Sequence, residues 1–167
     1  EINEEINNSW QDADNESITE SVNNKEINDV FMPFKQETPI FNDSVSQKRL
    51  VDAISDALRQ SFKAHDNLVI MGQDIAEYGG VFKITDGFVE EFGKSRIRNT
   101  PICESAIVST AYGLSINGFK SIVEMQFADF VSTGFNPIVN LLAKSYYRWK
   151  ENADVVIRMP TGAGVGA

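Results

Sequence analysis

The chain has 167 residues, a formal net charge of −9 and 42% apolar residues, which suits one ordinary globular domain. Its one cysteine and one histidine exclude an internal disulfide and a Cys/His zinc site. It holds no run of 18 apolar residues and no signal-like start, so we expect no membrane span and a cytoplasmic location. The acidic balance also argues against nucleic-acid binding, because no cluster of Lys and Arg could neutralise phosphates.

The excess negative charge lies in residues 1–45. They hold 11 acidic and 2 basic residues, eight asparagines and no glycine, whereas residues 46–167 hold 13 residues of each sign. Their apolar residues are sparse and irregularly spaced, which predicts an acidic linker or strap without a core of its own. Phe31, Phe34 and Ile40 could pin this strap to a neighbouring surface. Both ends of the sequence are expected to be cut, since it starts at Glu1 and stops within a glycine-rich segment.

From Ser46 onward, helical and strand patterns alternate. Apolar residues at helical spacing predict an amphipathic helix over residues 46–65. The wholly apolar run 68–71 predicts a strand buried on both faces, and 121–125 predicts another buried strand. Residues 96–99 and 154–159 are predicted as further strands, and helices are predicted at 88–92, 105–116 and 137–149. This alternation predicts a doubly wound α/β domain over residues 46–167, with a parallel sheet covered on both faces.

Ligands of such sheets bind where the strands end, so the loops that follow the predicted strands are the places to look. The loop 72–80 offers two carboxylates, an amide and a phenol, although a solvated surface loop is the simpler interpretation. Phe127 and Phe130 could form a flat wall for a planar ligand, while packing in the core is the commoner use of such a pair. The glycines of 162–166 lack the spacing of a dinucleotide fingerprint.

Glu104 has unusual neighbours. It is the only charged residue between Arg98 and Lys120, and apolar side chains flank it on both sides. A carboxyl group in such surroundings is either held protonated or paired with a specific partner, which is typical of functional sites. The alternative is that Glu104 merely occupies the first turn of a helix, where the helix dipole favours a carboxylate.

Four segments together resemble one known family: 71–80 (MGQDIAEYGG), 100–105 (TPICES), 123–130 (VEMQFADF) and 136–140 (NPIVN). They are similar, in order and spacing, to the pyrimidine-binding domain of the beta-type subunit of thiamine diphosphate-dependent 2-oxo acid dehydrogenases, the decarboxylating first component of the pyruvate and branched-chain complexes. The likeness runs from about Lys48 to Ala167. The acidic segment ending in 29–34 also resembles the connector of bacterial forms that fuse the alpha-type and beta-type halves.

The resemblance implies a transketolase-like fold and a set of site residues. Glu104 would be catalytic, holding a proton against the pyrimidine nitrogen of thiamine diphosphate. Phe130 and Gln126 would line the pyrimidine and the main chain near Ile102 would contact its amine, while Phe127 belongs to the core. A monovalent cation such as potassium would bind backbone carbonyls near Ala153, Val155 and Val156.

The resemblance also implies partners that this chain lacks. Magnesium and the diphosphate would be bound by an alpha-type half, fused or separate, because no Gly-Asp-Gly motif occurs here. The acyl group would pass to a lipoyl acyltransferase, and the enzyme would be an oligomer. The catalytic histidine of the family is expected beyond Ala167, and His65 cannot take that role. The fragment alone is therefore expected to be inactive.

Three other functions stay open at this point. A transketolase or a deoxyxylulose-phosphate synthase shares this type of domain but needs no lipoyl partner. A non-catalytic assembly module would use the acidic strap for docking. Nucleotide binding by the terminal glycines is the third. The sequence does not choose between pyruvate and a branched-chain 2-oxo acid as the substrate.

Overall fold

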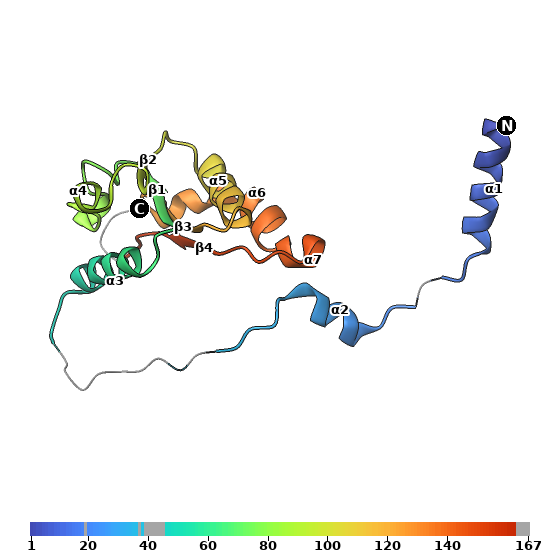
Figure 1. Cartoon of the computed structure of the whole chain (residues 1–167), viewed down its shortest axis with the longest axis horizontal. Helices are drawn as coiled ribbons and strands as arrows, with labels where there is room; N and C mark the ends of the chain where they lie inside the picture. Colours follow the sequence, from blue (N-terminus) through green and yellow to red (C-terminus); the bar gives the residue numbers. More distant parts are fainter. Residues whose placement is uncertain (19, 37, 39–45, 163–167) are drawn as a thin grey trace.

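A parallel sheet forms the centre of the protein (Figure 1). The computed structural model describes residues 1–18, 20–36, 38 and 46–162. Its four strands are β1 (Leu68–Gly72), β2 (Ile97–Asn99), β3 (Lys120–Glu124) and β4 (Val155–Arg158), in the order β2-β1-β3-β4. All neighbouring strands are parallel, and the last residues of β1, β3 and β4 are aligned in register. The predicted doubly wound parallel sheet is confirmed, with each strand within one residue of its expected bounds.

Helices cover both faces of the sheet, as alternating strands and helices require. On one face, α3 (Leu50–Ala64) and α4 (Phe88–Phe92) pack through Phe62, Phe88 and Phe92, whose rings lie within 6 Å of one another. On the other face, α5 (Glu104–Ile116) packs its buried residues against β1 and β3. The five residues of β1 are all buried, because both of its faces are covered.

Two predicted helices differ from the observed ones. The helix α3 begins at Leu50 rather than Ser46, and Leu50 itself is exposed. The single helix predicted over 137–149 is divided into α6 (Phe135–Pro137), a π-helical turn η3 (Ile138–Leu142) and α7 (Ser145–Trp149). The main-chain N–H of Ala143 reaches back five residues to the carbonyl of Ile138, which inserts an extra residue into the turn and breaks the regular spacing.

The N-terminal segment forms two short helices, α1 (Ile2–Asn15) and α2 (Asn23–Val30), neither of which has a buried residue. Phe31 and Phe34 are exposed and do not pin the segment to the domain, and Ile40 lies outside the described residues. The contact with the domain comes instead from α2, where the Asp29 carboxylate pairs with the Lys150 ammonium group at 2.8 Å just beyond α7. Among the described residues, no helix has the length and apolar character needed to cross a membrane.

Candidate active site

Glu104 is the first residue of α5 and is buried, with only 7% of its surface exposed. Its carboxylate lies close to the positive end of the helix dipole. Gln73, which directly follows β1, donates its side-chain Nε2–H to Glu104 Oε1 at 3.2 Å. Thr133 donates its hydroxyl to Glu104 Oε2 at 3.1 Å. Glu104 therefore begins a helix and also has specific hydrogen-bond partners.

The Thr133 hydroxyl group lies between two acceptors. Its Oγ1 is 3.1 Å from Glu104 Oε2 and 2.7 Å from the carbonyl oxygen of Phe130. A hydroxyl has one proton to donate and two lone pairs that accept. It can therefore donate to an ionised Glu104, or donate to Phe130 and accept a hydrogen bond from a protonated Glu104. Because it has a single proton, Thr133 donates to only one of these two oxygens at a time.

The other predicted cofactor residues lie on the segments that surround Glu104. Ile102 is two residues before it and is 82% exposed, Gln126 is half-buried just after β3, and Phe130 is 40% exposed within the 3-10 helix η2 (Ala128–Gly134). Phe127 and Phe130 contact each other at an interplanar angle of 67°, so the two rings do not make one flat wall. Ile102 and Phe130 thus expose apolar surface on segments next to the buried carboxyl group of Glu104.

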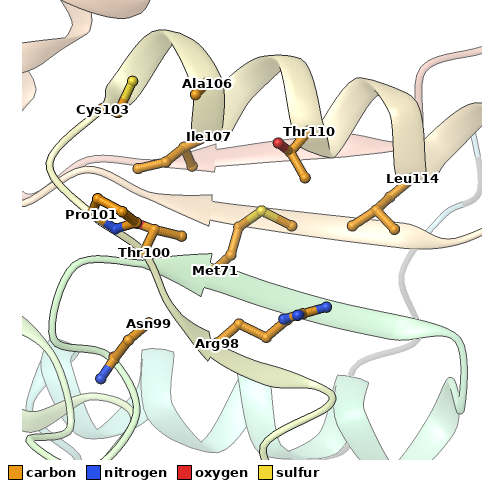
Figure 2. A pocket seen from close by; sticks show the side chains of 10 residues that line it. All are labelled: Met71, Arg98, Asn99, Thr100, Pro101, Cys103, Ala106, Ile107, Thr110 and Leu114. Atoms are coloured by element: carbon orange, nitrogen blue, oxygen red, sulfur yellow. The ribbon is translucent and has the colours of Figure 1, made fainter.

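A separate hollow of about 500 Å³ lies between α5 and the strands β1 and β2 (Figure 2). In Figure 2 Ile107, Thr110 and Leu114 point from α5 toward Met71, whereas the side chain of Asn99 points away from the helix. Cys103 lies at the start of the helix on the rim of this hollow, and Glu104 does not line it.

A second buried carboxylate, that of Glu124, was not identified from the sequence. Glu124 is 2% exposed and its Oε2 lies 2.5 Å from Arg158 Nη1. Burial raises the pKa of Glu124, and the nearby Arg158 guanidinium and Val81 main-chain N–H only partly offset that rise. Glu124 lies inside one of the motifs that carry the family resemblance, but an acidic residue at the end of a predicted strand is usually solvated, so no signal singled it out.

The predicted cation site cannot be recognised from side chains. The carbonyl of Ala153 accepts a hydrogen bond from the Val155 N–H at 3.0 Å, and Val155 and Val156 belong to β4. In the part of the chain that the structure describes, no three His, Cys, Asp or Glu side chains group into a metal site. Of the glycines in 162–166, only Gly162 is among the described residues.

Comparison with known families decides what kind of domain this is. Residues 46–167 match the family described as "Transketolase, pyrimidine binding domain". The chain belongs to this family. The matched residues include all four strands of the sheet and every predicted site residue, so the transketolase pyrimidine-binding domain comprises both the fold and the site described above.

Relatives refine the type of pyrimidine-binding domain. The chain is 42% identical over 120 residues to the pyruvate dehydrogenase E1 component subunit beta of Leifsonia xyli, which covers 71% of this chain and 36% of that protein. The subunits of the same name from Staphylococcus aureus and Staphylococcus epidermidis are 39% and 37% identical over 123 residues, covering 72% of this chain and 38% of theirs. The domain is of this E1 beta type, and the chain spans just over a third of the length of these relatives.

Proposed function

We propose that this pyrimidine-binding domain supplies half of the active site of a thiamine diphosphate-dependent 2-oxo acid dehydrogenase, the decarboxylating first component of a pyruvate-type complex. The observation that carries the proposal is the buried carboxyl group of Glu104, which is held by Gln73 and Thr133 at the edge of an exposed surface. The relatives bear the name of such a component.

The residues present fit the aminopyrimidine ring of thiamine diphosphate. Such a ring needs one carboxyl group opposite a ring nitrogen, an apolar surface for its flat face and polar groups at its edge. Glu104 supplies the first, the exposed ring of Phe130 the second, and Gln126 with the main chain near Ile102 the third. When bound, thiamine diphosphate supplies the nucleophilic carbon that attacks the 2-oxo group of the substrate.

The chemical task of Glu104 would then be to share a proton with a pyrimidine nitrogen. Because the carboxyl group is shielded from water, that proton would stay between the two groups instead of exchanging with solvent. The Thr133 hydroxyl lies within hydrogen-bond distance of Oε2, where it can either donate or accept. Gln73 donates to the other oxygen, Oε1.

The remaining parts of the enzyme belong to other chains or segments. We assign the diphosphate and its magnesium ion to an alpha-type half, fused or separate, because the exposed edge beside Glu104 needs a second surface to close it. We further propose a lipoyl acyltransferase as the acceptor of the acyl group, an oligomeric assembly, and residues 1–45 as the linker before this domain. A potassium ion at the carbonyls of Ala153, Val155 and Val156 would brace β4.

The test is the Glu104→Gln variant of the enzyme assembled with its alpha-type half. Loss of one positioned acid typically costs about 10²–10⁴-fold in rate, so turnover of pyruvate with an artificial electron acceptor should fall by that factor. The exposed Glu90→Gln serves as the matched control and should turn over normally. Near-normal turnover of Glu104→Gln, with normal folding by circular dichroism, would refute the assignment.

The choice of acyl acceptor is tested separately. A 2-oxo acid dehydrogenase should acylate a lipoylated protein domain, whereas a transketolase or a deoxyxylulose-phosphate synthase should transfer its two-carbon unit to a sugar phosphate or a sugar-derived aldehyde. Comparing pyruvate with a branched-chain 2-oxo acid in the same assay fixes the substrate. Transfer to the sugar acceptor alone would favour the transketolase type of enzyme.

A further inference from the structure

The pair formed by Glu124 and Arg158 has no part in the mechanism proposed above. The two residues end β3 and β4, face each other in register and are 2% and 14% exposed at the side chain. A buried ion pair of this kind is weak evidence for a stabilising role, because taking both charges out of water costs about as much as their attraction returns. The position of the Glu124–Arg158 pair next to the candidate active site is therefore more informative about its role than its charge.

Glu124 approaches the loop 73–85, which follows β1, at two places. Just before this loop, at the end of β1, a Cβ on Gly72 would lie 2.7 Å from the main-chain oxygen of Glu124 and 3.0 Å from its Cβ. Farther along, a Cβ on Gly80 would lie 3.1 Å from the carboxylate oxygen Oε1 of Glu124. Because neither glycine has a side chain, the main chain at both positions can approach Glu124 closely. Only the approach of Gly80 involves the carboxylate of Glu124.

The loop is closed on itself by its own hydrogen bonds. The Gly80 N–H donates to the carbonyl of Asp74 at 2.8 Å, and the Thr85 hydroxyl donates to the carbonyl of Ile75 at 2.7 Å. A displacement of Gly80 is therefore transmitted to Asp74, the neighbour of Gln73. Gln73 is the residue that donates to Glu104.

We propose that Glu124, held by Arg158, is a positioning residue that fixes the loop 73–85 and thereby keeps the amide of Gln73 on the carboxyl group of Glu104. The consequence for catalysis rests on the proposed function, whereas the fixing of the loop does not. Glu124 acts through Gln73 and touches no reacting atom in this assignment.

A double-mutant cycle in the assembled enzyme tests the path through Gln73. Residues that act through one another show coupling of about 0.5–3 kcal/mol, so Glu124→Gln should lower kcat about tenfold in the parent enzyme. In the Gln73→Leu background the same substitution should lower kcat less than about twofold, because the contact it disturbs is already absent. Equal effects in both backgrounds, or an unchanged kcat in Glu124→Gln alone, would overturn the proposal.

Hydrogen exchange of the chain supplies a readout that does not depend on activity. Glu124→Gln should speed amide exchange within residues 74–85, and the exposed control Glu90→Gln should not. If Glu124→Gln does not fold, Arg158→Lys, which keeps the positive charge but loses the planar guanidinium, takes its place in both experiments with the same expected pattern. Unchanged exchange in the loop overturns the proposal. If Glu124→Gln speeds exchange in the loop but the parent enzyme turns over no 2-oxo acid, the positioning role of Glu124 stands and only the proposed function is refuted.

Discussion

Gln73 and Glu104 are 31 residues apart in the chain, and the side-chain amide of the first donates to the carboxylate of the second at 3.2 Å. The contact exists because β1 and α5 meet at the carboxyl edge of the parallel sheet. Gln73 follows the last residue of β1, and α5 begins with Glu104 after the chain has passed through β2. The order of the strands in the sheet therefore brings Gln73 and Glu104 together. Four predictions test contacts of this kind.

Replacing Gln73 by Leu should destabilise the protein. The substitution keeps the size of the side chain but leaves the buried Oε1 of Glu104 without its donor, which costs about 1–3 kcal/mol of unfolding free energy. Urea denaturation monitored by circular dichroism measures this change. Gln60→Leu, on an exposed position of α3, is the matched control and should change the unfolding free energy little. Equal stability of the two variants would show that the amide of Gln73 contributes nothing.

Gly80→Ala should destabilise the loop more than Gly87→Ala does. Gly87 is in the left-handed region at φ 76° and ψ 0°, where a side chain costs about 1–2 kcal/mol. Gly80, at φ 70° and ψ −178°, is in a region used essentially only by glycine, where a side chain costs about 1–3 kcal/mol. Only at Gly80 would the new Cβ also meet Glu124 Oε1 at 3.1 Å and Thr85 Oγ1 at 3.2 Å, whereas nothing lies within 4 Å at Gly87. Thermal unfolding of both variants measures the difference, and identical melting temperatures would contradict the close approach of the loop to Glu124.

The stability of the protein should depend on pH through Glu124. Burial raises the pKa of Glu124 in the folded state above its usual value near 4.5. Between that value and the raised pKa, the folded protein holds a proton that the unfolded chain releases, so this residue lowers stability as the pH rises through the window. Unfolding midpoints measured upward from pH 4.5 should therefore fall less steeply for Glu124→Gln than for the parent protein. A steeper decline in the variant would reverse the assigned direction.

Phe62→Ala should be among the most damaging single substitutions. The ring is 1% exposed, and it stacks on Phe92 at 5.0 Å and meets the edge of Phe88 at 5.9 Å. Removing such a ring costs about 3–5 kcal/mol. Phe34→Ala is the control, because Phe34 is 86% exposed and its loss should leave the unfolding free energy almost unchanged. Similar melting curves for the two variants would contradict the position of Phe62 in the core.

The sequence by itself determined the class of fold and indicated the region of the candidate site. Strand patterns that alternate with helical patterns predict a doubly wound parallel sheet, and the wholly apolar run 68–71 indicates a strand buried on both faces. The apolar neighbours of Glu104 likewise marked it as a carboxyl group that needs partners. Local patterns carry this information because strand period, helix period and burial are properties of neighbouring residues.

Only the tertiary structure decided which residues those partners are. Thr133 gave no signal in the sequence, since a threonine in a polar turn usually faces water, and it reaches Glu104 because η2 folds back beside α5. The pairing of Glu124 with Arg158 depends on the register of β3 and β4, which no local pattern reports. Contacts between segments so far apart in the chain are set by strand order and register, and these are decided when the whole chain packs.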